Sequence, residues 1–328
     1  MQEAIQVKDL SKKFFVRKNF PGVRGAIKGL FHKETSEVTA IDRISFSISR
    51  GERVAFIGPN GAGKSTTIKM LTGILHPSSG EIKVLGLTPW EKRSRLGYEI
   101  GAVFGQRSQL WYQLPPSDTF LLLSKIYDLD RATFERDLKE LVEIFEIGRL
   151  LEKPVRQLSL GERMRCELVA SLLHKPKILF LDEPTIGLDI SAKLKIRALL
   201  NKLSKEEETT LFLTSHDTGD IEQVCDRVLI LDKGKIMLDT SLKDLKKSYV
   251  KKKVLRLTTT EESLPLHLPG VEVLENKNYN FVCEVNLSLM PIEQVVHETL
   301  KVTTLKDVTI EDPSMEEIIR NLYLEAPL

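Results

Sequence analysis

The chain has 328 residues, of which 41% are hydrophobic and 29% are charged, so it can form two ordinary globular domains. Lysine and arginine (48) nearly balance aspartate and glutamate (46), and this charge indicates no nucleic acid or acidic membrane as a partner. The apolar runs are far shorter than the roughly 18 to 20 residues that cross a bilayer. The start, MQEAIQVKDL, has no pattern of a secretory signal, and we expect a cytosolic chain. The three separated cysteines fit reduced thiols.

Strands and helices alternate along the first 240 residues. Residues 41–48 alternate apolar and polar side chains, which predicts a half-exposed strand, and 54–57 are a short apolar run typical of a buried one. Helical spacing at 64–75 ends before Pro77, because proline disfavours continuation. Such alternation predicts a mostly parallel sheet covered by helices. The remaining predicted elements are helices at 120–127, 134–147, 161–173 and 191–203 and strands at 178–181, 210–214 and 228–231.

Two segments lie outside this alternation. Residues 16–39 interleave basic with apolar side chains, which predicts a short amphipathic helix on a loop; either a lengthened surface hairpin or a contact with a membrane or membrane partner would explain it. A lysine-rich run after residue 241, which we interpret as a solvated linker face, leads into a predicted accessory α+β domain at 241–328. Its closing helix begins with the capping box at 314–317.

A phosphate-binding loop is predicted between the buried strand at 54–57 and the helix that follows. Its glycines let backbone N–H groups turn toward phosphate oxygens, and the helix N-terminus adds favourable partial charge. Within it, Lys64 would neutralise β- and γ-phosphate oxygens, and Ser65 would ligate Mg²⁺. The segment fits the pattern GxxxxGK[ST] and consists of Gly58, Pro59, Asn60, Gly61, Ala62, Gly63, Lys64, Ser65 and Thr66.

Two carboxylates follow the apolar run at 178–181, at the strand end where ligands of open α/β sheets bind. Asp182 can hold Mg²⁺ through water, and Glu183 can polarise the water that attacks the γ-phosphate. Together with the loop, the pair predicts hydrolysis of a nucleoside triphosphate.

Four further segments resemble motifs of the nucleotide-binding subunits of ABC transporters. The sequence LSLGE at 158–162 resembles the LSGGQ signature, Asp189 in Gly-Leu-Asp the D-loop, His216 in TSHD the switch histidine, and Gln106 in VFGQRSQL the Q-loop glutamine. Their order and spacing match the family over residues 1 to about 240. The resemblance implies a P-loop NTPase core of ABC type, with a mixed sheet, an antiparallel β subdomain and a helical signature subdomain at about 90–174.

The resemblance also implies site roles. ATP and Mg²⁺ would be the cofactors, with Gln106 as a metal ligand beside Ser65 and Asp182, although Gln109 competes for the Q-loop role. Ser159 and Gly161 would face the γ-phosphate bound to a second subunit in a head-to-tail homodimer or heterodimer, with Asp189 nearby. Two signature positions depart from the family, since Leu160 replaces a glycine and Glu162 a glutamine. For adenine stacking, Phe14 occupies the family's aromatic position, and Phe15 is its rival.

The implied partners are separate membrane permease subunits, contacted through the Gln106 loop and residues 111–116, which would place the chain at the cytoplasmic face of the membrane. Among ABC transporters, the chain most resembles ATPases of the type-two exporter class. The resemblance does not assign the transported substrate. A soluble ABC ATPase acting on ribosomes or DNA is the alternative, but such factors carry two motif sets or long coiled coils. A small-molecule kinase or GTPase using the same loop would lack the signature helix.

Overall fold

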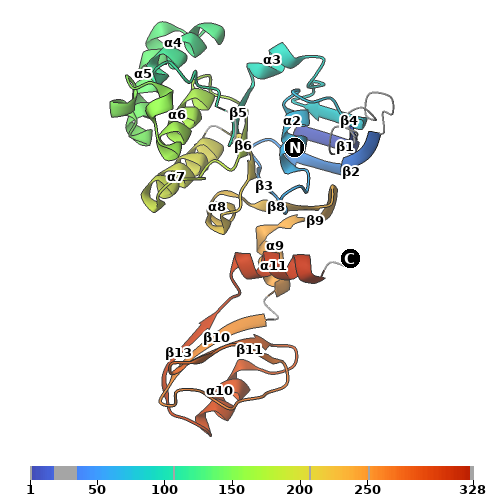
Figure 1. Cartoon of the computed structure of the whole chain (residues 1–328), viewed down its shortest axis with the longest axis vertical. Coiled ribbons are helices and arrows are strands. Elements are labelled where there is room, and N and C mark those ends of the chain that lie inside the picture. The colour runs from blue at the N-terminus through green and yellow to red at the C-terminus, as the bar shows by residue number, and fades with distance from the viewer. Residues whose placement is uncertain (1, 18–34, 106–107, 207, 250–251, 326–328) are drawn as a thin grey trace, which may run out of the picture. The chain divides into compact units, whose positions relative to one another are not determined.

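The computed structural model describes residues 2–17, 35–105, 108–206, 208–249 and 252–325. The chain divides into two compact units, Met1–Thr240 and Ser241–Leu328 (Figure 1). Within the described ranges, no helix combines the length and the apolar character needed to cross a bilayer.

A six-stranded sheet forms the centre of the first unit, in the order β5-β6-β7-β3-β8-β9. The first five strands in this order, β5, β6, β7, β3 and β8, are parallel, as the buried apolar runs predicted. The rings of Phe46, Phe56 and Phe212 pack together at its core, with centroids 5.1–6.3 Å apart. The strands are β3 (Arg53–Ile57), β5 (Ile100–Phe104), β6 (Ile178–Asp182), β7 (Thr210–Thr214), β8 (Arg227–Asp232) and β9 (Lys235–Ser241).

A separate antiparallel sheet has the order β2-β1-β4, with β1 at Glu3–Arg17, β2 at Thr35–Ser49 and β4 at Ser79–Val84. The predicted strand at 41–48 lies within β2. The amphipathic helix predicted inside 16–39 falls mostly on residues 18–34, which lie outside the described residues; the flanking positions belong to β1 and β2. The mixed fold with an antiparallel subdomain is thereby confirmed.

Helices cover the central sheet, and α4 to α6 gather at one side of the first unit (Figure 1). Helix α2 ends at Leu71 rather than at the predicted residue 75, because Gly73 adopts a positive φ of 71° that closes the helix. Two short 3-10 turns, Gly148–Leu150 and Val155–Gln157, connect α5 to α6. The helices are α2 (Lys64–Leu71), α3 (Arg93–Gly97), α4 (Pro116–Ile126), α5 (Arg131–Phe145), α6 (Leu160–Leu172), α7 (Ile190–Glu206) and α8 (Thr218–Val224).

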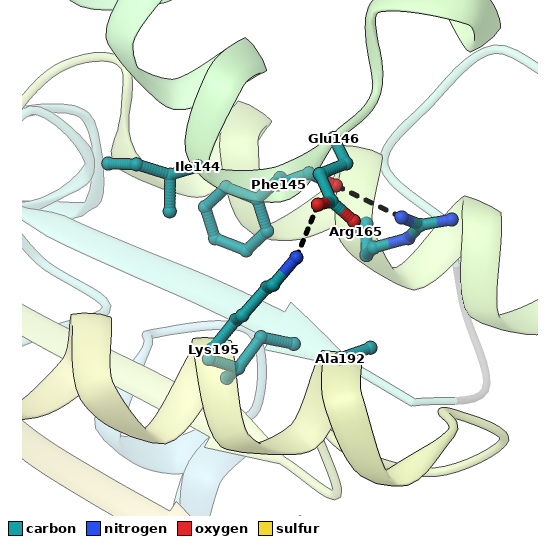
Figure 2. A pocket seen from close by; sticks show the side chains of 7 residues that line it. Ile144, Phe145, Glu146, Arg165, Ala192 and Lys195 are labelled. Carbon is teal, nitrogen blue, oxygen red and sulfur yellow. Dashed lines mark hydrogen bonds and ion pairs between the residues drawn. The ribbon is translucent and has the colours of Figure 1, made fainter.

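Figure 2 shows where the end of α5 meets α6 and α7. Lys195 on α7 forms an ion pair with Glu146, and Arg165 on α6 donates to the Phe145 carbonyl oxygen at 3.1 Å. The Lys195 and Glu146 side chains are 45% and 60% exposed, so we expect this pair to contribute little to stability. Phe145 is 4% exposed, so burial of its ring contributes to stability where these helices meet.

The second unit is an α+β fold, as predicted. Its four-stranded antiparallel sheet has the order β11-β12-β10-β13, and apolar side chains of the sheet and α10 form its core. The lysine-rich run predicted to be a linker is partly helix α9, with its lysines exposed. The elements are α9 (Leu242–Tyr249), β10 (Lys252–Thr259), β11 (Val271–Lys277), β12 (Asn280–Asn286), α10 (Ile292–Leu300), β13 (Leu305–Glu311) and α11 (Met315–Glu325).

Candidate functional site

The predicted phosphate loop connects β3 to α2, and its shape requires glycine at three positions. A β-carbon on Gly58 would lie 2.4 Å from the Leu231 carbonyl oxygen on β8. Gly61 and Gly63 have φ angles of 82° and 109°, which L side chains rarely adopt. A β-carbon on Gly63 would also lie 2.7 Å from the Ala40 carbonyl oxygen. Of the other predicted loop residues, Pro59 and Asn60 are exposed at the tip, Ala62 is buried, and Thr66 is half-buried on α2.

The Lys64 side chain folds back into this loop and is only 7% exposed. Its Nζ donates to the carbonyl oxygens of Gly58, at 2.6 Å, and Pro59, at 3.2 Å. Burial lowers the pKa of Lys64, while the carboxylates of Glu183 and Asp182 act in the opposite direction. An anion that entered the loop would supply the countercharge that the buried ammonium favours.

Asp182 lies at the end of β6 and contacts the start of α2. Its carboxylate accepts hydrogen bonds from the hydroxyl groups of Ser65, at 2.8 Å, and Thr214, at 2.6 Å. The two predicted metal ligands Ser65 and Asp182 are thus adjacent. No cluster of three His, Cys, Asp or Glu side chains able to hold a metal exists among the described residues. A hydroxyl and one carboxylate suit Mg²⁺, which usually binds few protein oxygens and takes its remaining ligands from water and substrate phosphates.

Glu183 and His216 follow the neighbouring strands β6 and β7, and their side chains meet. The Glu183 carboxylate lies 3.3 Å from Nε2 of His216. Glu183 adopts a left-handed φ of 56°, which is uncommon for a residue with a side chain, while its N–H donates to the Thr214 carbonyl oxygen at 3.0 Å. Such strain is typical of functional sites, because the surrounding structure must maintain it.

Ser159 begins helix α6 with the capping box expected from its sequence. The Ser159 hydroxyl accepts from the Glu162 N–H at 3.2 Å, and the Glu162 carboxylate accepts from the Ser159 N–H at 2.9 Å. A β-carbon on Gly161 would lie 2.8 Å from the Gly187 carbonyl oxygen, so the helix packs closely on that turn. The exposed Asp189 caps α7 by accepting from the Ala192 N–H at 2.8 Å. These residues form a second group of contacts, apart from those around Lys64.

The two candidate adenine-stacking residues lie next to each other on β1. Phe14 is 37% exposed, with the Lys12 ammonium 5.2 Å from its ring centroid, and Phe15 is 71% exposed. Successive side chains of a strand point to opposite faces, so only one of the two rings can face a given ligand.

Gln106 lies outside the described residues, but its rival Gln109 is engaged with α6. The Gln109 side-chain amide donates to the Glu167 carbonyl oxygen at 2.9 Å, and its backbone N–H lies 3.1 Å from the Glu167 carboxylate. The Ser108 hydroxyl also bonds to this carboxylate. Glu167 is 4% exposed, and burial raises its pKa although these hydrogen bonds oppose the shift.

Sequence reasoning missed Glu167, and it also missed Arg197 and Asp220, which form a buried ion pair at 2.7 Å behind His216. Each stands at an ordinary helical position where a charged residue is expected to face solvent.

Comparisons with known proteins agree with this geometry. The family model described as ABC transporter matches residues 41–186. The uncharacterized ABC transporter ATP-binding protein YhcH of Bacillus subtilis (strain 168) is 35% identical over 206 residues, which are 63% of this chain and 66% of YhcH. The bacitracin transport ATP-binding protein BcrA of Bacillus licheniformis is 33% identical over 208 residues, which are 63% of this chain and 67% of BcrA. The chain thus spans about two thirds of the length of these relatives.

A solved structure, described as the ATP binding subunit of an ABC transporter, matches with a TM-score of 0.63 and 26% identity. The match covers 75% of this chain and 93% of that one. Fold and loop together define a phosphate-loop ATPase with a mixed α/β sheet. The chain belongs to the family of ABC transporter ATP-binding proteins, and the resemblance that its motifs indicated is confirmed.

Proposed function

We propose that the chain is the ATP-hydrolysing subunit of an ABC exporter, that it dimerises head to tail, and that it drives separate membrane permease subunits. The observation that carries the proposal is that the site residues form two groups, each able to provide half of a nucleotide site. One group surrounds Lys64, Ser65 and Asp182, and the other presents Ser159 and Gly161 at the start of α6.

In the first half-site, the loop N–H groups and Lys64 would bind the phosphates of ATP. Ser65 and Asp182 would hold Mg²⁺, which supplies charge neutralisation when bound. Glu183 would accept a proton from the attacking water, and His216 would orient Glu183 across their 3.3 Å contact. The left-handed backbone of Glu183 sets the direction in which its carboxylate projects from the end of β6.

In the second half-site, Ser159 and Gly161 would contact the γ-phosphate held by the partner subunit, and Asp189 would lie at the same interface. Because ATP contacts both halves, it favours the closed dimer, and loss of the γ-phosphate removes that preference. Gln106 remains the proposed Q-loop residue, since the amide of Gln109 is bonded to α6.

An exposed apolar patch, made of Trp111, Tyr112 and Leu114, supports contact with a permease. Their side chains are 47%, 58% and 40% exposed, and exposed groups of this kind are enriched at protein interfaces. The carbonyl oxygens of Tyr112 and Leu114 accept from the N–H groups of Arg156 and Val155, both at 3.0 Å. The patch is therefore bonded to the segment immediately before Ser159. We infer a peripheral location at the cytoplasmic face of the membrane, through such a permease.

The proposal of export draws on the likeness to BcrA, whose name assigns it to bacitracin transport. Co-expression with candidate permeases, followed by purification from membranes, tests the partnership. Recovery of the chain with ribosomes or nucleic acid, and with no membrane protein, would favour the soluble alternative instead.

Replacing Glu183 with glutamine tests the catalytic assignment. Loss of the proton acceptor should lower the rate of ATP hydrolysis by roughly 100-fold or more, while shape and ATP binding stay intact. ATP-bound dimers should then accumulate on size-exclusion chromatography. The matched control is Glu143→Gln on the exposed face of α5, which should hydrolyse ATP at the normal rate. Normal turnover by Glu183→Gln would refute the assigned mechanism.

A further inference from the structure

A buried carboxylate lies behind the loop that carries His216. Asp220, on α8, is 1% exposed. One of its oxygens accepts from the hydroxyl groups of Thr185, at 2.5 Å, and Ser215, at 2.8 Å, and the other accepts from Nε of Arg197 at 2.7 Å. Thr185 follows Glu183 by two residues, Ser215 precedes His216, and Arg197 lies on α7. Asp220 therefore joins three elements that border the catalytic pair.

The same guanidinium reaches the residue on the other side of His216. Nη2 of Arg197 lies 3.0 Å from Oδ1 of Asp217, and Nζ of Lys193 lies 2.6 Å from Oδ2 of the same carboxylate. Partial burial raises the pKa of Asp217, but the bond from Lys193 and the charge of Arg197 outweigh it and lower the pKa. The Asp217 N–H in turn donates to the Ser215 hydroxyl at 3.0 Å.

These contacts fix the backbone on both sides of His216, whose own side chain is 52% exposed. Lys193 and Arg197 lie one turn apart on α7, and α7 begins directly after Asp189. A planar guanidinium with its fork of donors can hold two carboxylates in fixed directions. The geometry thus connects the turn of Asp189 to the position of the His216 ring.

We propose that Arg197 and Asp220 are positioning residues for ATP hydrolysis: they hold the His216 loop so that its ring meets Glu183, and α7 couples that loop to Asp189. The proposal rests on the catalytic role proposed above for Glu183 and His216. Neither Arg197 nor Asp220 needs to touch ATP, because Asp220 acts through the side chain of Ser215 and Arg197 through that of Asp217.

The test uses the chain of 328 residues carrying Arg197→Lys. Lysine keeps the charge but cannot bridge Asp220 and Asp217 as the fork does. A misplaced His216 should lower kcat about tenfold or more, with the KM for ATP changed less than about twofold. The matched control is Arg136→Lys on the exposed face of α5, which should keep both constants. A turnover equal to that of this control would overturn the proposal.

A merely structural role for Arg197 is distinguished by combining the change with His216→Ala. If Arg197 acts through His216, Arg197→Lys should produce no further decrease in the His216→Ala background, measured as single-turnover hydrolysis of labelled ATP. If the double variant instead showed the product of the two single decreases in hydrolysis rate, the proposal would be overturned. Normal hydrolysis by His216→Ala alone would instead refute the role assigned to His216. Should Arg197→Lys fail to fold, Thr185→Val removes one hydrogen bond to Asp220 without changing a charge, and the same comparison of kcat with and without His216 applies.

Discussion

Replacing Gly58 with alanine would test whether the tight base of the phosphate loop determines nucleotide binding. Gly58 has no positive φ, so alanine can adopt its backbone conformation and the effect comes from the β-carbon alone. That carbon would lie 2.4 Å from the Leu231 carbonyl oxygen, whereas ordinary contacts begin at 3.4 Å. The loop and β8 must therefore separate by about 1 Å.

The loop, rather than β8, should move. Leu231 is fully buried, and β8 pairs with β3 through the central sheet. A shift of about 1 Å displaces the carbonyl oxygen that accepts from Lys64 and the N–H groups that would face phosphates, and such a misplacement can cost about 100-fold in rate. Overpacking should also lower the free energy of unfolding by about 1–3 kcal/mol.

Urea unfolding and titration with a fluorescent ATP analogue measure the two effects. Gly86→Ala is the control, because Gly86 has a positive φ of 76° but no heavy atom within 4 Å of a built β-carbon. It should lose about 1–2 kcal/mol of stability from backbone strain and bind ATP normally. If Gly58→Ala bound ATP as tightly as Gly86→Ala, the steric reasoning would be wrong.

Two further predictions concern buried groups of α6. Burial raises the pKa of Glu167, so the stability contributed by its protonated form is lost as pH rises from the unfolded value of 4.5 through the raised folded pKa. Relative to the unmodified chain, Glu167→Gln should therefore gain stability in urea titrations as the pH is raised above 4.5, and a difference independent of pH would contradict this. Burial also raises the pKa of the Cys166 thiol to about 12, so a thiol reagent should label Cys166 only at the rate of unfolding. Mass spectrometry of the labelled peptide measures this rate, and rapid labelling of the native chain would contradict the prediction.

The central strands were predictable from sequence because each is a short apolar run bounded by a turn. Strand β5 was missed, since its Gly101 interrupts the pattern; a β-carbon there would lie 2.6 Å from the Ser171 carbonyl oxygen, so the glycine is required by packing. Strand β1 was missed for another reason. Register shifts between Val7 and Leu10, with Asp9 at a φ of 46°, break its alternation of apolar and polar side chains.

The contacts within the proposed first half-site were predictable in part because parallel strands place their carboxyl ends along one edge of the sheet. That rule brings Asp182 near Ser65 and Glu183 near His216. No such rule reveals the buried Asp220, because a carboxylate is buried only where tertiary structure supplies donors such as Arg197. Residues that support the site from behind, such as Asp220 and Arg197, can therefore be identified only in the folded structure.

Ser159 shows that a structural and a functional role can share one hydroxyl group. As the cap of α6, its oxygen accepts from the Glu162 N–H, and this use leaves the hydroxyl proton able to donate elsewhere. An exposed donor at a helix N-terminus suits an anionic phosphate oxygen. Glu162 replaces the glutamine of the family signature. Its carboxylate accepts a hydrogen bond from the Ser159 N–H, and that bond lowers the pKa of Glu162. The substitution therefore preserves the cap, and it leaves Ser159 oriented for the contact proposed across the dimer.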